Sequence, residues 1–233
     1  MLTRPEPNAE RTAAALRARG HSVTVAPLLR IEPVDAEIGR GPWAAILVTS
    51  ANAAAAIARH KRFAELKSVP VLAVGERTAQ AMRSAGFTEV ISAAGAAGDL
   101  TRLAAGRLTQ DVPLLYLAGM DRSGDIAGDL STRNFTVCTA VVYRAIAADA
   151  LPRAAAEALA GGVDGVLHFS RRSAEVFVNT ARAAGMTKAA LEKPAHFCLS
   201  VQVAEPLSQA GAAEIRIAVR PEEAALIELI PAA

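Results

Sequence analysis

Two stretches of the chain repeat one strand–helix–strand pattern, and this repetition constrains the fold more than any other feature. In 69–94, VPVLAVGERTAQAMRSAGFTEVISAA, an apolar run precedes a helix-forming segment that stops at Gly86, and a second apolar run follows. In 196–219, HFCLSVQVAEPLSQAGAAEIRIAV, the same pattern recurs, with Gly211 at the place of Gly86. Each stretch therefore predicts a βαβ unit.

Two further pairs of segments match in the same order along the chain. The segment 46–56, ILVTSANAAAA, parallels 166–176, VLHFSRRSAEV, and 16–31 parallels 130–146. Three ordered matches predict an ancient duplication of a small α/β half. Chance similarity among alanine-rich amphipathic segments is the alternative.

The alternation of apolar runs and helical patterns predicts a parallel sheet in each half, with helices on both faces. Between 44 and 139 there are five such runs, the fifth at 135–139, and the rest of the chain supplies five more, which include 1–3 and 22–26. We therefore expect an α/β protein of two flavodoxin-like parallel-sheet domains joined by a two-stranded antiparallel ribbon. A single large mixed sheet is the alternative.

The expected boundaries follow from where the two halves begin and end. The prediction is a discontinuous α/β domain at 1–28 and 147–233, an inserted α/β domain at 35–139, and a linker ribbon at 29–34 and 140–146. The ribbon is predicted because PLLRIEP lies between two prolines, which disfavours a central strand, and because VVYRA is its counterpart in the duplication.

Composition narrows the class of protein. The chain has 233 residues, a formal net charge of +2 and two cysteines, and no apolar run reaches the length of roughly 20 residues that a membrane span needs. The charge gives no reason to expect a nucleic-acid partner, and the start MLTRPEPN does not resemble a secretory signal. We expect a cytoplasmic protein without a membrane partner, and a monomer because no long exposed apolar seam is apparent.

Ligands of open parallel sheets bind beyond the carboxyl ends of the strands. Hydroxyl-bearing residues, glycines and arginines gather at the predicted strand ends, and the candidate binding residues are Arg4, Thr49, Ser50, Ala51, Asn52, Gly75, Thr78, Gly119, Arg122, Ser170, Arg171, Arg172, Ser200 and Gln202, with Asp121 beside them. This set lacks a Cys/His cluster, paired carboxylates and a Walker lysine, so we expect no metal. It suits an anion with several carboxylates or phosphates. Helix capping is the alternative for each hydroxyl, and a solvated pair is the alternative for the two adjacent arginines.

Five segments together resemble the uroporphyrinogen-III synthase family, and the resemblance covers nearly the whole chain. They are LTRP at 2–5, ILVTSANA at 46–53, VLAVGERTAQAMRSAGF at 71–87, LYLAGMDR at 115–122 and VVYRA at 141–145. The resemblance implies two α/β domains joined by a ribbon, with the active site in the cleft, and no metal or organic cofactor. It also implies the reaction. Hydroxymethylbilane loses water, closes through a spiro intermediate, and gives a macrocycle with ring D inverted.

The resemblance further implies a role for Tyr143, which matches the family's ribbon tyrosine, as the acid that assists departure of the hydroxyl group. Aromatic packing is the alternative role. The second half departs from the family pattern, because this chain has Ser200, Val201, Gln202 and Val203 where a glycine and threonines are usual, and Pro206 follows in the helix. This departure leaves open a second hypothesis, a non-catalytic two-domain protein that binds a small polycarboxylate or other anion.

Overall fold

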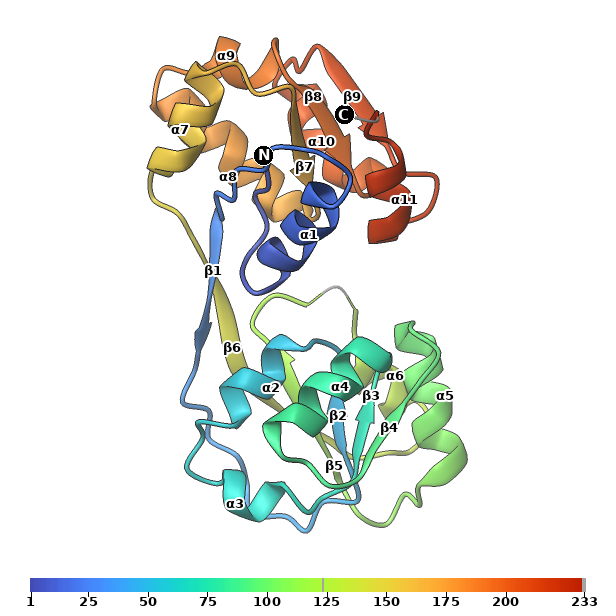
Figure 1. The fold of residues 1–233 in the computed structure, drawn as a ribbon. Coiled ribbons are helices and arrows are strands. Elements are labelled where there is room, and N and C mark those ends of the chain that lie inside the picture. Colours follow the sequence, from blue (N-terminus) through green and yellow to red (C-terminus); the bar gives the residue numbers. More distant parts are fainter. Residues whose placement is uncertain (123, 232–233) are drawn as a thin grey trace. The chain divides into compact units, whose positions relative to one another are not determined.

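The structure is a computed structural model that describes residues 1–122 and 124–231. A helix is predicted from about Ser123, which lies outside the described residues, as do the last two residues of the predicted discontinuous domain. The chain divides into two compact units (Figure 1). Unit 1 contains Met1–Arg30 and Ile146–Ala233, and unit 2 contains Ile31–Ala145. Both units are α/β, and the pairs of strands within each sheet are mainly parallel.

Both connections between the units lie in a ribbon of two strands, β1 (Leu29–Pro33) and β6 (Val137–Ala147), which run side by side (Figure 1). The Val34 amide donates to the Val142 carbonyl at 2.8 Å, and the Ala148 amide donates to the Leu28 carbonyl at 2.9 Å. Residue numbers rise on one strand as they fall on the other, so the ribbon is antiparallel. The sequence predicts separate strands at 135–139 and 141–145, whereas the structure has one strand of 11 residues.

Unit 2 is built on a sheet in the order β1-β6-β5-β2-β3-β4. Its other strands are β2 (Ile46–Val48), β3 (Val71–Ala73), β4 (Val90–Ser92) and β5 (Leu114–Gly119). Its helices are α2 (Asn52–Ile57), α3 (Phe63–Leu66), α4 (Glu76–Ala85), α5 (Ala97–Arg107) and α6 (Ile126–Ser131).

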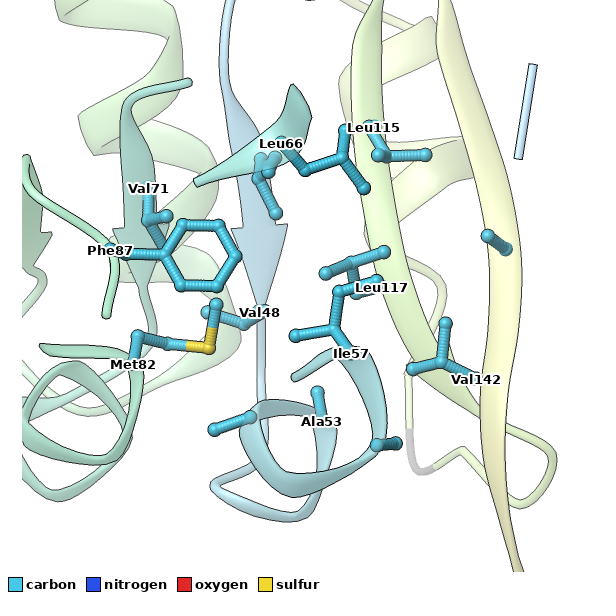
Figure 2. Close-up of a cluster of buried hydrophobic side chains, with 14 of the residues drawn as sticks. Val48, Ala53, Ile57, Leu66, Val71, Met82, Phe87, Leu115, Leu117 and Val142 are labelled. Carbon is cyan, nitrogen blue, oxygen red and sulfur yellow. The ribbon is translucent and has the colours of Figure 1, made fainter. Parts of the chain in front are cut away.

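Alternate residues of these strands serve two separate cores. Figure 2 shows one face, where Val48, Leu115 and Leu117 meet Ile57 of α2 and Met82 of α4. The neighbouring strand residues on the other face pack against α5 and α6. Burial on both faces explains why the strands are continuous apolar runs, since each fully buried Val, Leu or Ile contributes about 1.5–3 kcal/mol.

Unit 1 contains β7 (Gly165–His168), β8 (Ala195–Cys198) and β9 (Glu214–Ile217), which form a parallel sheet in that order. Its helices are α1 (Asn8–Arg17), α7 (Arg153–Ala160), α8 (Arg171–Ala183), α9 (Thr187–Leu191), α10 (Val201–Gln209) and α11 (Glu223–Glu228).

The two N-terminal strands predicted in unit 1 are shorter than expected. Each is reduced to a single bridging residue: Leu2 forms parallel bridges to Val25 on one side and to Leu167 on the other. The pairing beside Leu2 ends early because Pro5 has no N–H to donate, and Pro7 precedes α1 directly.

The flavodoxin-like strand order is correct for one unit and wrong for the other. If the bridging segments at Leu2 and Val25 are counted as the first two strands of unit 1, its strands lie in the order 2-1-3-4-5, as in flavodoxin. The five parallel strands of unit 2 lie in the order 3-2-1-4-5. The difference arises from where the chain enters each unit. Read from β7 to the C-terminus and then from the N-terminus, unit 1 has the same spatial order as unit 2. The segment pairs that match in sequence then occupy equivalent strands, which supports the duplication.

Candidate active site

A cavity of about 310 Å³ lies in unit 2 at the carboxyl ends of β2 and β5. Five of the predicted site residues line it: Thr49, Ser50, Gly119, Arg122 and Tyr143. They meet there because the strands of a parallel sheet all end at the same edge. Residues far apart in the sequence thus share one hollow, as expected from the strand-end positions.

Several hydroxyl-bearing side chains line this cavity, and hydrogen bonds hold them in place. Thr49 Oγ1 lies 3.0 Å from the hydroxyl oxygen of Tyr116. The Ser50 hydroxyl accepts a hydrogen bond from the Asn52 amide at 3.2 Å, and the Ser50 side chain is also hydrogen-bonded to the Tyr143 hydroxyl. Ser50 thus lies one residue before the N-cap, Ala51, and accepts from the first amide of α2, while the same side chain also contacts the tyrosine that the family resemblance singles out.

The Tyr143 phenol stays neutral in this environment. Partial burial raises the pKa of Tyr143 above its ordinary value, and the nearby Tyr116 and Asp121 act in the same direction, while the hydrogen bond from Ser50 opposes them. A phenol with a raised pKa is protonated throughout the neutral range. Tyr143 is thus equipped to donate a proton or a hydrogen bond into the cavity.

One hydroxyl-bearing side chain of the cavity is not among the residues predicted from the sequence. Tyr116 is buried in β5 and reads as a core residue in the run LLYLAG, but its hydroxyl reaches Thr49 and its side chain lines the cavity. The signal that could have found it is chemical, because a buried tyrosine hydroxyl needs a partner and a strand end supplies one. Asp121 also lines the cavity and adds a carboxylate beside the predicted Arg122.

The remaining candidates of unit 2 belong to the starts of helices. Ala51 and Asn52 begin α2, and Gly75 precedes the first residue of α4 with an extended backbone. Thr78 is buried on the inner side of α4. None of these four lines the cavity, so their contribution to binding stays a prediction.

The side chain of Arg4 contacts other residues of unit 1. Its side chain is largely buried, Nη1 lies 3.0 Å from Thr12 Oγ1 and 3.1 Å from a Glu223 carboxylate oxygen, and its guanidinium stacks on the Phe169 ring at 4.0 Å. Burial acts to raise the pKa of Glu223, but the hydrogen bond from Thr12 and the charge of Arg4 lower it overall. This arrangement gives Arg4 a structural role, and its role in substrate binding stays a prediction.

The other candidates of unit 1 lie where α8 and α10 begin. Ser170 caps α8 by accepting from the Ser173 amide at 3.1 Å, and Arg171 forms ion pairs with Glu175 and Glu205. Arg172 is half-buried in the first turn of the same helix. Ser200 and Gln202 lie at the start of α10, where Ser200 makes no capping hydrogen bond and Gln202 is exposed. The helix begins at Val201 despite the departure from the family pattern.

A hollow of about 500 Å³ in unit 1 lies at the opposite edge of its sheet, among the first residues of the strands, such as Gly165, Ala195 and Glu214. The predicted binding residues of unit 1 do not line it. Size alone therefore does not identify the site, and we assign the candidate active site to the smaller cavity of unit 2, where five predicted residues converge.

The described part of the chain contains neither a cluster of metal ligands nor a membrane-spanning helix. Among residues 1–122 and 124–231, no three His, Cys, Asp or Glu side chains come together as metal ligands would. Within the same residues no helix has both the length and the apolar character of a membrane span.

Known proteins resemble this chain in sequence and in fold. A family model described as uroporphyrinogen-III synthase HemD matches residues 10–228. The fold is similar to the uroporphyrinogen-III synthetase structure from Helicobacter pylori 26695, with a TM-score of 0.67, 20% identity, and coverage of 90% of this chain and 94% of that one. The wild-type uroporphyrinogen III synthase structure from Thermus thermophilus matches at a TM-score of 0.43 and 17% identity over 98% of this chain and 95% of that one. No curated protein sequence matched the chain. The family match spans most of the sequence, and the chain belongs to the uroporphyrinogen-III synthase HemD family.

Proposed function

We propose that this protein is a uroporphyrinogen-III synthase, a cyclising hydro-lyase of tetrapyrrole biosynthesis that takes hydroxymethylbilane as its substrate. One observation carries the proposal beyond membership of the family. The neutral, half-buried phenol of Tyr143 shares a cavity with the hydroxyls of Thr49 and Ser50 at the carboxyl edge of a parallel sheet. These uncharged hydroxyl groups can donate hydrogen bonds to a hydroxide as it leaves the substrate.

Tyr143 acts as the acid in the first step. The hydroxymethyl carbon–oxygen bond breaks as the Tyr143 hydroxyl delivers a proton, so water leaves and the pyrrole end becomes an azafulvene electrophile. The substituted carbon of the terminal pyrrole attacks this electrophile and forms the spiro intermediate. After fragmentation and reclosure, the final ring loses a carbon-bound proton, which restores the phenol of Tyr143 and balances the reaction as substrate to product plus water. General acid catalysis of this kind contributes on the order of a hundredfold or more.

Holding the chain of four pyrroles is the larger task, because the free substrate cyclises to the isomer in which ring D is not inverted. The protein must bring the attacking carbon and the electrophile together in the geometry of the spiro closure, which is catalysis by positioning. Both Arg122 and Thr49 line the cavity, where Arg122 supplies a positive charge and Thr49 a hydroxyl group for hydrogen bonding. Both suit the eight carboxylates of the substrate.

The experiment is isomer analysis with purified hydroxymethylbilane. We expect the purified, chelator-treated protein to give mainly the type III isomer without added metal or organic cofactor. Only type I product from folded protein would refute the synthase and favour the alternative, a non-catalytic binder of a polycarboxylate. The proposal also includes a cytoplasmic, monomeric protein with no nucleic-acid partner. Size-exclusion chromatography with light scattering tests the monomer.

A further inference from the structure

Gly119 ends β5, and the space beside it is filled by the ring of Tyr143. A Cβ atom added to Gly119 would lie 2.6 Å from Cζ and 2.7 Å from the hydroxyl oxygen of Tyr143. Non-bonded carbon atoms normally sit about 3.5–4.0 Å apart, so even one methyl group would collide with the phenol. The backbone of Gly119 does not have the positive φ that favours glycine. The lack of a side chain here therefore serves the close approach of the ring and not a special backbone conformation.

A β-bulge brings Tyr143 opposite this glycine. In the parallel pairing of β5 with β6, Ala118 pairs with Val141, and Gly119 pairs with Tyr143. Val142 is therefore an extra residue in β6 without a partner in β5. The Met120 amide donates to the Tyr143 carbonyl at 2.9 Å, which fixes the backbone beyond the bulge.

The extra residue changes the direction in which Tyr143 points. Neighbouring residues of a regular strand face opposite sides of the sheet, so Val142 and Tyr143 would be expected to contact different cores. Val142 is fully buried in the cluster that Figure 2 shows, and Tyr143 packs against the same cluster. Bulges re-aim side chains in this way, often beside active sites. Here the bulge turns the phenol across the end of β5, above Gly119.

We propose that Gly119 is a positioning residue, which acts through Tyr143 by leaving room for the phenol at the one place where it meets Ser50 and the cavity. The catalytic consequence rests on the proposed synthase function, whereas the steric relationship does not. The position of Gly119 at a strand end predicts that it binds substrate. The proposal assigns it a different task, which is to hold the acid and not to contact the bilane.

The test compares Gly119→Ala in three backgrounds: the wild type, Tyr143→Phe and Tyr143→Ala. In the wild type we expect kcat to fall on the order of tenfold to a hundredfold with little change in KM, since displacement of a catalytic group by about 1 Å can cost that much. In the Tyr143→Phe background Gly119→Ala should lower kcat no further, because the hydroxyl that it displaces is already gone. An equal loss in both backgrounds would overturn the proposal, because Gly119 would then act independently of the phenol.

A spectroscopic arm works even if the protein does not make the type III isomer. The chain has two tyrosines, so a protein labelled with carbon-13 at tyrosine Cζ gives two resonances, and Tyr143→Phe assigns them. We expect Gly119→Ala to shift the Tyr143 resonance and leave that of Tyr116 in place. An unchanged Tyr143 resonance would overturn the proposal. Failure of the isomer assay with a shifted resonance would refute the synthase function alone.

If Gly119→Ala folds poorly, melting temperatures provide the test. Tyr143→Ala removes the ring and with it the collision, so Gly119→Ala should lower the melting temperature less in the Tyr143→Ala background than in the wild type. An equal loss in both backgrounds would overturn the proposal. Gly106→Ala is the matched control. Gly106 lies in α5 with no atom within 4 Å of an added Cβ. That substitution should leave kcat and both resonances unchanged.

Discussion

His168 Nε2 lies 3.1 Å from His196 Nδ1, and both imidazoles are completely buried on the adjacent strands β7 and β8. The Phe177 ring packs on both, with centroids 5.2 Å and 5.9 Å away. A single N–H fills the shared hydrogen bond, so one ring donates and the other accepts. Two protonated rings would each present a hydrogen to the other, so the folded unit disfavours protonation of both rings.

This pair makes the stability of unit 1 depend on pH. Burial, together with the nearby His196 and the N-terminal amine, lowers the pKa of His168 well below its usual value, and burial lowers the pKa of His196 to about 4. Below about pH 6.5 the unfolded chain binds protons that the folded unit does not, so the free energy of unfolding falls as the pH falls from 6.5 towards 4. Each histidine contributes up to about 1.4 kcal/mol per pH unit in this window. Hydrogen exchange of β7 and β8 peptides measures it.

The control for the histidine pair is His196→Gln, which removes one titrating group. We expect it to reduce the slope of stability against pH between 6.5 and 4, and an unchanged slope would contradict the assignment. The Met1 amine adds a separate slope at higher pH, because burial lowers its pKa from 8.0 to about 6 and Asp164 offsets this only in part. Its sign is the same, since the unfolded amine binds the proton first as the pH falls from 8 to 6.

Arg4 and Glu223 provide the second prediction, which separates a structural arginine from one that binds substrate. Their side chains are 11% and 26% exposed, so removal of one partner leaves the other partly buried and unpaired. We expect Arg4→Met to lower the free energy of unfolding by about 3 kcal/mol. KM and kcat per folded molecule should change little, as measured by turnover at a temperature where the variant is folded. A raised KM with unchanged stability would instead assign Arg4 to the substrate.

Gly106 in α5 gives a third prediction, in which stability should rise. An added Cβ meets no atom within 4 Å, and the backbone is helical, so alanine fits without strain. Glycine loses more chain entropy on folding than alanine does, and we expect Gly106→Ala to stabilise unit 2 by about 0.5–1 kcal/mol. Thermal unfolding measures the change. A lower melting temperature would show that the turn of α5 around Gly106 needs the freedom of glycine.

The parallel arrangement could be predicted because it follows from local patterns. Apolar runs such as ILV in β2 alternate with helical segments. Gly86, whose φ is 107°, ends one of these helices, α4. The order of strands could not be predicted in the same way, since it depends on where the chain enters each duplicated half. The short pairings of Leu2 were also missed, because their length is set by the prolines that follow and not by the apolar pattern.

The candidate site was predictable to the extent that strand ends converge. Thr49, Gly119 and Arg122 meet in one cavity because a parallel sheet puts its carboxyl ends together. The position of a residue along a strand does not reveal whether its side chain already forms an ion pair within the protein. Arg4, which pairs with Glu223, is an example. Nor does the pattern reveal a bulge, which decides where Tyr143 points.

Tyr143→Phe is the final prediction, and it addresses the acid directly. The variant keeps the aromatic ring and removes the hydroxyl that meets Ser50, so we expect kcat to fall on the order of a hundredfold. Stability should change by about 1 kcal/mol or less, the value of one hydrogen bond. Tyr116→Phe is the matched comparison, because it removes the other tyrosine hydroxyl of the cavity, which bonds to Thr49, and its loss of kcat should be below tenfold. Stopped-flow turnover beside thermal unfolding distinguishes the outcomes. Equal losses in the two variants would make the hydroxyls interchangeable parts of the binding surface, and an unchanged kcat in Tyr143→Phe would return Tyr143 to a packing role.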